Sequence, residues 1–325
     1  MPGFEVIGIG SPLVDHLLYV PESYVESIGG EKFGMELVDY PKMIAIIEES
    51  GKKPVLLAGG SAANTAKALA SLGSYTAFIG KSGKDPAAET FLQGLAKANV
   101  AAKLVRCDTP TGHAVCLITP DGNRTCRTYP GASLELVPED LDPEIFYGAK
   151  WVHIEGYALL NDSLAERAMH LANEAGAKIS FDLGSFELVR TYRKRILKLA
   201  EKFITCIFAN EAEACQVWNS SAEESAKRLS DICPLALVMQ GDKGGIIGQN
   251  GKTNRFATNP VTPVDTTGGG DFFAAGFIHG QLLDQPPEIC AKIGALCGRA
   301  VVQVVGTQLL EESWADIRKE ILLFT

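Results

Sequence analysis

Residues 264–277 read Val-Asp-Thr-Thr-Gly-Gly-Gly-Asp-Phe-Phe-Ala-Ala-Gly-Phe, with three consecutive glycines followed by an aspartate. Because glycine has no Cβ atom, the N–H groups of Gly268, Gly269 and Gly270 can converge on one anion. Residues 272–281 have helical character, so these amides would lie at a helix N-terminus, where the helix dipole favours negative charge. The stretch therefore predicts an anion site beside Asp271.

Asp271 has two interpretations at this position. A carboxylate beside the anion site can accept a proton from an attacking hydroxyl while a phosphoryl group is transferred. In an isolated Gly-Gly-Gly-Asp sequence, the aspartate would more often only cap the helix. The longer pattern, with Asp265 six residues before and Ala275-Gly276-Phe277 after the aspartate, favours the catalytic interpretation.

The composition excludes several classes of protein. Of 325 residues, 46% are hydrophobic and 21% charged, which is the balance of a folded globular protein. The net charge of −9 opposes binding to nucleic acid, which needs a basic face. No apolar run reaches the roughly 18–20 residues of a membrane span. The first residues lead directly into an apolar segment without a basic targeting region, so we expect a cytoplasmic protein.

Apolar runs alternate with helical patterns along most of the chain. We expect strands near residues 4–9, 75–79, 151–154, 178–182, 204–209, 235–239 and 245–247, and helices near 41–50, 59–73 and 87–98. This alternation predicts an α/β fold with a mostly parallel, doubly wound sheet and helices on both faces. Residues 112–118 and 124–128 flank a Pro-Asp-Gly-Asn turn and are expected to form a hairpin.

The pattern of residues 265–271 resembles the C-terminal signature of the PfkB, or ribokinase-like, carbohydrate and nucleoside kinases. The usual signature is Asp-Thr-x-Gly-Ala-Gly-Asp, and Gly269 replaces its alanine here. Residues 59–64 resemble the family's N-terminal Gly-Gly-x-x-x-Asn motif. The resemblance extends from Val6 to about Gln308, with the motifs in the family's order.

The resemblance implies a ribokinase-like three-layer α/β/α doubly wound fold with a small β-rich lid. Residues 1–15, 59–103 and 131–325 would form the core, and residues 16–58 and 104–130 the lid. In such a fold Gly59 and Gly60 form a hinge for lid closure, and Asn64 binds a substrate hydroxyl. Without the resemblance, the same residues would be interpreted as an ordinary glycine-rich helix start.

Further acceptor residues follow from the adenosine-kinase-like branch. Residues 8–15 resemble its opening strand and loop, whose aspartate, here Asp15, holds two ribose hydroxyls. Arg124 resembles a lid arginine that reaches over the transferring phosphate. The resemblance also suggests that Phe33, Met35 or Tyr129 could pack against a purine. Alternatively, these apolar residues only seal the lid sheet, Asp15 is a turn residue and Arg124 an exposed charge.

The nucleotide site is implied by three further motifs. Asn210 and Glu213 resemble the family's Asn-x-x-Glu motif, whose acidic residue organises Mg²⁺ through water, although the pattern alone is also typical of a capped helix start. Gly241 and Gly244 resemble the glycine turn beside the nucleotide. The family commonly has threonine where this chain has Met239.

The remaining nucleotide residues belong to the glycine-loop signature. Asp265 and Thr266 are expected to lie at the nucleotide, and a K⁺ site near Asp265 and residues 305–307 is a further implication of the resemblance. A side chain or backbone amide at Gln240 could replace the missing threonine contact.

These motifs together predict an ATP- and Mg²⁺-dependent kinase that phosphorylates a small molecule. Adenosine is the first choice of acceptor, ahead of a ribokinase- or fructokinase-type sugar, and a non-catalytic sensor on the same fold is a third alternative. A dehydrogenase would need a third glycine where Leu13 stands, and no Walker sequence occurs. We expect a monomer or a homodimer.

Overall fold

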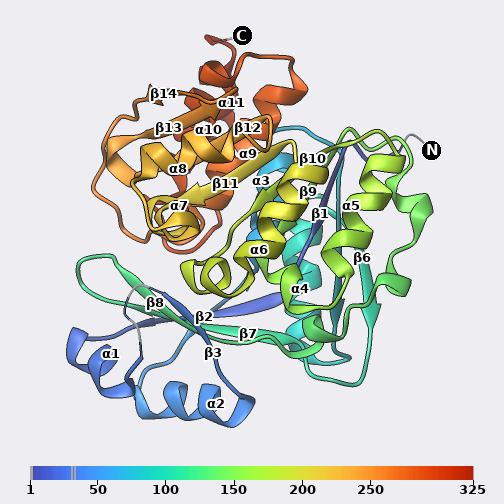
Figure 1. The fold of residues 1–325 in the computed structure, drawn as a ribbon. Helices are drawn as coiled ribbons and strands as arrows, with labels where there is room; N and C mark the ends of the chain where they lie inside the picture. Colours follow the sequence, from blue (N-terminus) through green and yellow to red (C-terminus); the bar gives the residue numbers. More distant parts are fainter. Residues whose placement is uncertain (1–2, 31, 33, 325) are drawn as a thin grey trace.

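The chain folds around two β-sheets, a large one and a small one (Figure 1). This computed structural model describes residues 3–30, 32 and 34–324. The large sheet has nine strands in the order β14-β13-β12-β11-β10-β9-β1-β5-β6, parallel from β12 to β6. Only β13 and β14 run antiparallel to their neighbours. The predicted mostly parallel sheet is therefore confirmed.

The strands of the large sheet have the following bounds: β1 Val6–Ile9, β5 Thr76–Ser82, β6 Ala101–Arg106, β9 Trp151–Glu155, β10 Lys178–Asp182, β11 Cys206–Asn210, β12 Leu235–Met239, β13 Gly245–Gln249 and β14 Lys252–Phe256. The strand predicted at 245–247 is the first half of an antiparallel hairpin whose second strand was not predicted. The sequence of β14 is mostly polar, so it lacks the apolar pattern from which the other strands were predicted. An edge strand tolerates such residues because their side chains can remain in water.

Helices cover both faces of the large sheet and make the predicted three-layer α/β/α arrangement. One face carries α3 Ser61–Ser71, α4 Pro86–Lys97, α9 Gly269–Leu282, α10 Pro287–Val301 and α11 Glu311–Ile321. The other carries α5 Leu164–Glu174, α6 Phe186–Lys202, α7 Glu211–Trp218 and α8 Ala222–Leu229. Short 3₁₀ turns occur at Gly131–Glu135, Pro138–Asp140, Pro143–Phe146, Gly156–Leu160 and Gly241–Lys243.

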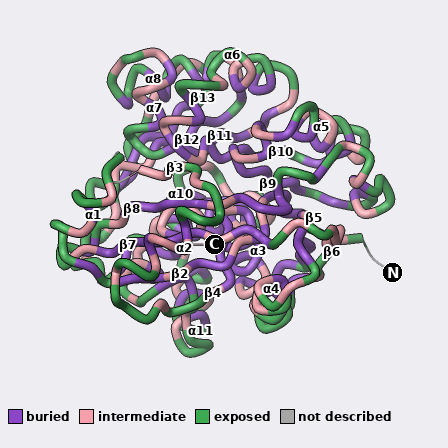
Figure 2. Tube along the Cα trace, turned by 90° about the horizontal axis from the view of Figure 1, so that it is seen from below, coloured by how far each residue is buried: buried purple, intermediate pink, exposed green. Residues whose placement is uncertain are grey.

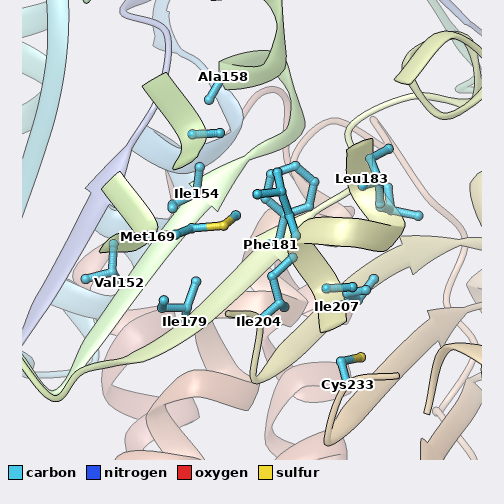
Figure 3. Close-up of a cluster of buried hydrophobic side chains, with 14 of the residues drawn as sticks. Val152, Ile154, Ala158, Met169, Ile179, Phe181, Leu183, Ile204, Ile207 and Cys233 are labelled. Carbon is cyan, nitrogen blue, oxygen red and sulfur yellow. The ribbon is translucent and has the colours of Figure 1, made fainter. Parts of the chain in front are cut away.

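The strands bury side chains on both faces, so each face of the sheet has its own hydrophobic core. Ile207 packs into the layer with α5–α8, whereas its neighbour Phe208 packs into the layer with α9–α11. This alternation follows from the two-residue period of a strand. Figure 2 shows the central strands of the large sheet mostly buried, with exposed residues along the outer helices. Figure 3 shows part of the first core, around Phe181.

The small sheet stands off the main layers and forms the predicted lid. Its strand order is β3-β8-β7-β2-β4, with bounds β3 Met35–Leu37, β8 Arg124–Tyr129, β7 Gly112–Ile118, β2 Leu13–Tyr19 and β4 Val55–Gly59. Helices α1 Glu22–Ile28 and α2 Tyr40–Glu49 lie below it in Figure 1. Buried residues of both helices pack on one face of the lid, which leaves the other face toward the core domain.

The boundaries between core and lid differ from those predicted. Residues 104–106, which were assigned to the lid, belong to β6 and pair with residues 80–82 of β5 in the large sheet. Conversely, residues 13–15, which were assigned to the core, are the first residues of β2 and pair with residues 112–114 in the lid. Both errors arise because a strand is identified by its pairing partner, which local sequence does not specify.

We predict that Phe181→Ala lowers the free energy of unfolding by about 3–5 kcal/mol, the usual cost of leaving a cavity in place of a buried ring. Phe181 is fully buried on β10. Urea unfolding measures the change, and Leu323→Ala is the control because Leu323 is 81% exposed. An equal effect of the two substitutions would contradict the core assignment.

Candidate active site

The carboxyl ends of the parallel strands open into a cavity of about 770 Å³ between the core and the lid. Ser11 follows β1, and Asp182, Asn210 and Met239 end β10, β11 and β12; all four line the cavity. The inner face of the lid covers the cavity from the other side. Open α/β sheets bind ligands at this edge, because the connections after the strands diverge there.

Most of the predicted site residues meet in this one cavity. The lining includes Asp15, Gly60, Asn64, Arg124, Asn210, Glu213, Gly241, Gly244, Thr266, Gly268, Gly269, Gly270 and Asp271. Gly59 and Asp265 are not part of the lining. Residues separated by more than 200 positions in the chain are thus brought together, as the order of the motifs suggested.

Asp271 lies in the first turn of α9, directly after the glycine loop. Its two carboxylate oxygens accept hydrogen bonds from Ser61 Oγ at 2.8 Å and Asn64 Nδ2 at 2.9 Å. Burial raises the pKa of Asp271, although both hydrogen bonds act in the opposite direction. The carboxyl group is therefore held by α3 and partly withdrawn from water, which favours its protonated form more than in a free carboxyl group.

A chain of hydrogen bonds orients Asn64. Thr307 Oγ1 donates to Asn64 Oδ1 at 3.1 Å, so the amide nitrogen faces Asp271. Asp265, completely buried, accepts from the backbone N–H and the hydroxyl of Thr267 and from the N–H of Gly306. Asp265 thus ties the glycine loop to the segment that carries Thr307, and its contacts are structural rather than directed into the cavity.

The glycine loop has the backbone geometry that its sequence requires. Gly268, the N-cap of α9, has φ 76°, a left-handed conformation that favours glycine. A Cβ atom at Gly268 would lie 2.6 Å from Thr307 Cγ2, whereas one at Gly270 would lie 3.7 Å from Met239 Cε. Only Gly268 therefore needs to be glycine on steric grounds.

Gly59 and Gly60, where β4 of the lid leads into α3, are closely packed. A Cβ atom at Gly59 would lie 2.1 Å from Asp15 Oδ1, and Gly60 has φ 92° and would place a Cβ atom 2.3 Å from the carbonyl oxygen of Ser11. Burial, with a contribution from the Cys126 thiolate, raises the pKa of Asp15 to about 7. Asp15 thus lines the cavity from β2 as a group that changes protonation near neutral pH.

Two cations offset the buried carboxylates. Arg124 lines the cavity from the start of β8; burial disfavours its charge, but Cys126, Cys116 and the carboxylates outweigh it and raise the pKa of Arg124. Lys67, on α3, is 8% exposed and donates to the carbonyl of Ala58 at 2.6 Å. Burial lowers the pKa of Lys67 to about 8, although Asp15 and Asp271 favour its charged form.

Asn210 and Glu213 form the reciprocal cap of α7. Asn210 Oδ1 accepts from the Glu213 N–H at 2.9 Å, and the Glu213 carboxylate accepts from the backbone N–H and the side-chain amide of Asn210. Burial raises the pKa of Glu213 to about 7 despite these bonds. Asp182, buried at the end of β10, has a pKa raised by burial and by Glu213. Asn210 and Glu213 therefore cap α7 and also line the cavity.

The turn after β12 adopts the expected glycine conformation. Gly241 and Gly244 have φ 60° and 81°, and a Cβ atom at Gly244 would lie 2.1 Å from the Phe256 carbonyl. Met239 lines the cavity where the family commonly has threonine. The Gln240 side chain bonds to Glu211 at 2.7 Å outside the cavity lining, so it does not replace the threonine there.

The predicted purine contacts are only partly placed in the cavity. Met35 lines it from β3. Tyr129 lies on the opposite face of the lid, against Tyr40 at 5.3 Å between ring centroids, because successive residues of a strand alternate between faces. Phe33 lies outside the described residues.

Four site residues were missed by the sequence analysis. Glu155, buried at the end of β9, accepts from the N–H groups of Ser11 and Ala62 and so joins the β1 loop to the start of α3. Asp182 ends β10 in the same way, and a polar residue after a buried strand is a signal that could have revealed both. Lys67 carries no such signal. Thr307 was expected only as part of a K⁺ site, and its bond to Asn64 was not predicted, because the two residues lie far apart in the chain.

The cavity fits a nucleotide with a hydrated divalent cation. The N-terminus of α9 offers the backbone amides and positive dipole that suit phosphate. Throughout residues 3–30, 32 and 34–324, no group of three or more His, Cys, Asp or Glu side chains is placed to hold a metal ion. Mg²⁺ commonly keeps several waters and binds through one or two carboxylates and the substrate phosphates, which Glu213 and Asp182 could provide.

Comparison with known protein families identifies the family of this chain. The description "pfkB family carbohydrate kinase" matches residues 31–314. The chain belongs to the pfkB family of carbohydrate kinases. As a pfkB kinase it is a phosphotransferase that uses ATP and acts on a hydroxyl group. Asp271 and the glycine loop lie within the matched region of this pfkB kinase.

Similar proteins include kinases of nucleosides and of sugars. The pfkB kinase is 32% identical to a fructokinase of Klebsiella pneumoniae, covering 72% of this chain and 80% of the relative. It is 27% identical to the adenosine kinase of Saccharomyces cerevisiae, covering 93% of this chain and 95% of the relative.

Similar solved structures also include both a nucleoside kinase and a probable sugar kinase. Adenosine kinase from Sinorhizobium meliloti superimposes with a TM-score of 0.92 at 29% identity, covering 98% of this chain and 99% of the other. A probable sugar kinase from Rhizobium etli has a TM-score of 0.93 at 27% identity, covering 99% and 100%. The fold of this pfkB kinase is thus ribokinase-like.

None of the helices in the described part of the chain is long and apolar enough to span a membrane.

We predict that Gly268→Ala destabilises the pfkB kinase by about 1–3 kcal/mol, the cost of a strained left-handed residue. The added methyl group would also press on Thr307, which orients Asn64. Gly270→Ala is the matched control, since its Cβ atom would make an ordinary contact. The two free energies of unfolding, measured in urea, should differ; equal values would argue against the strained loop.

Proposed function

We propose that this kinase transfers the γ-phosphoryl group of ATP to the 5′-hydroxyl of adenosine, with Asp271 as the general base. The observation that supports it best is the position of Asp271. Its buried carboxylate lies in the first turn of α9, next to the amides of Gly268–Gly270 and under the lid. A hydroxyl acceptor between the lid and α9 would meet base and phosphate-binding amides together.

The residues of the chain divide the work of catalysis. Asp271 takes the proton of the acceptor hydroxyl, and Asn64 and Ser61 hold the carboxylate in place. The Gly268–Gly270 amides and Arg124 stabilise negative charge as the phosphoryl group moves. ATP supplies the phosphoryl group; Glu213 would hold Mg²⁺ through water, and the bound ion would offset the charge of the phosphates. The lid excludes water that would compete as acceptor.

Adenosine is supported by the mixed chemistry of the lid's inner face. Asp15 lines the cavity from β2, and a carboxylate can accept hydrogen bonds from two ribose hydroxyls. Leu13 and Met35 from the lid, and Phe186 from the start of α6, are apolar lining residues that could pack against a base. The similarity to adenosine kinases extends over 93% and 98% of the chain, although the similarity to a probable sugar kinase extends over 99% of it.

A sugar such as fructose is the second candidate. The relative with 32% identity is a fructokinase, and Asp15 and Asn64 could equally bind a sugar's hydroxyls. Binding of K⁺ near Asp265, a cytoplasmic location and a monomeric or homodimeric state stay predictions.

The direct test is phosphate transfer from Mg²⁺-ATP to adenosine, inosine, guanosine, cytidine, ribose and fructose. We expect adenosine to be phosphorylated best, and Asp271→Asn to lower kcat by at least about 10²-fold, the contribution of a general base. Ser61→Ala, which removes one hydrogen bond to the base, should cost less. Preferred turnover of fructose would contradict adenosine as the acceptor, and full activity of Asp271→Asn would contradict Asp271 as the general base.

We predict that kcat/KM for the acceptor falls on the acid side, by about tenfold per pH unit below pH 7. Asp271 must be ionised to take the proton of the acceptor, and Asp15 must be ionised to accept hydrogen bonds from two hydroxyls. Burial raises the pKa of both residues, that of Asp15 to about 7. Lowering the pH therefore protonates them and removes activity. Asp15→Asn should move the remaining acid limb to the pKa of Asp271; an unchanged profile would exclude Asp15 as its source.

A further inference from the structure

Two cysteines face each other on the inner face of the lid. Cys116 on β7 and Cys126 on β8 are directly opposite in the antiparallel register, with their sulfur atoms 3.6 Å apart. They are 2% and 7% exposed, and both line the cavity. The catalytic roles proposed above use neither thiol.

The backbone geometry of this pair suits a covalent bridge. The N–H of Cys126 donates to the carbonyl of Gly34 on the β3 side, and the carbonyl of Ile118 accepts from Val20, so these alternate positions point away from the β7–β8 ladder. Cys116 and Cys126 are therefore a non-hydrogen-bonded pair, whose Cα atoms lie about 4.5 Å apart in antiparallel sheets. Disulfides span Cα separations of about 4.4–6.8 Å, so a bridge needs rotation of the side chains rather than movement of the strands.

The surroundings favour a reactive thiolate at Cys126. The hydrogen bond between the two sulfur atoms and the charges of Arg124 and Arg127 together outweigh burial and lower the pKa of Cys126 to about 6. By contrast, burial raises the pKa of Cys297, in the main core, to about 12. Thiolates, not thiols, react with peroxides.

We propose that Cys116 and Cys126 are an oxidation site, at which a peroxide that enters the cavity converts the two thiols into a reversible intrachain disulfide. Cys126 sulfur attacks the peroxide, forming an S–O bond while the O–O bond breaks and water leaves. Cys116 sulfur then attacks Cys126, forming the S–S bond while the S–O bond breaks and a second water leaves. The two thiols are oxidised, and one hydrogen peroxide is reduced to two waters.

The bridge would change the acceptor side of the cavity. Cys126 is two residues from Arg124 along β8, and its thiolate interacts electrostatically with Asp15. Loss of the thiolate charge would by itself favour ionised Asp15, but a disulfide would also tie β7 to β8 at this point and change the shape of the cavity lining beside Arg124. The change of shape is the expected cause of reduced activity. We expect acceptor turnover to fall, and this part of the inference rests on the proposed function.

The test of the bridge is independent of activity. The full-length protein, kept reduced and then treated with hydrogen peroxide, is alkylated, digested and analysed by mass spectrometry. A peptide pair joined through Cys116 and Cys126, reversed by dithiothreitol, is expected. Cys297→Ala should keep the bridge, and Cys116→Ala should lose it. Free alkylation of both cysteines after peroxide, or bridges to other cysteines instead, would overturn the proposal.

The effect on turnover is measured on the same samples, with the acceptor that the panel identifies. Peroxide should lower kcat/KM by about tenfold in the starting protein and in Cys297→Ala, with recovery after dithiothreitol. Cys126→Ala, which lacks the sulfur that attacks the peroxide, should keep its own activity through the treatment. Equal loss in Cys126→Ala would overturn the link between bridge and activity. Absence of turnover before any treatment would instead count against the proposed function, leaving the mapped bridge as its own result.

Discussion

The site depends on the hydrogen bonds that join the N-terminus of α3 to the N-terminus of α9. Ser61 and Asn64 donate to the two oxygens of Asp271, across more than 200 residues of sequence. Because Asp271 is partly buried, the pair of bonds limits the energetic penalty of a carboxylate in a low-dielectric environment. The same contact places Gly59 and Gly60, the glycine loop and Asp271 close to one another, so a shift of either helix would displace all of them.

Other buried groups hold the two helix N-termini in position around the bonds to Asp271. Glu155 binds the N–H of Ala62 at the start of α3, and Asp265 fixes the loop before α9 to the segment of Thr307, which in turn orients Asn64. These are carboxylates and hydroxyls whose bonds are nearly all internal. Such a network is rigid when every member is satisfied, which suits a site whose catalytic power comes from fixed positions.

The charge balance explains why the cavity suits an anionic ligand with a cation. Asp15, Asp271, Asp182 and Glu213 all have raised pKa values because of burial. Arg124, at the start of β8, is the cation that lines the cavity on the lid side. A divalent ion would favour the ionised forms of the nearby carboxylates, and phosphate would be attracted to the amides of α9. The site is thus electrostatically incomplete without its ligands, and ligand binding and ionisation support each other.

The sequence by itself determined the local features: the alternation of strands and helices, the glycine loop at the start of α9 and the capped start of α7, because each depends on a few neighbouring residues. Only the tertiary structure decided that β6 belongs to the large sheet, that Tyr129 faces away from the cavity, that Lys67 joins the site and that Thr307 bonds to Asn64. Strand pairing, the face that a side chain occupies and the burial of a charge are all set by contacts between distant segments, and local propensity carries no information about them.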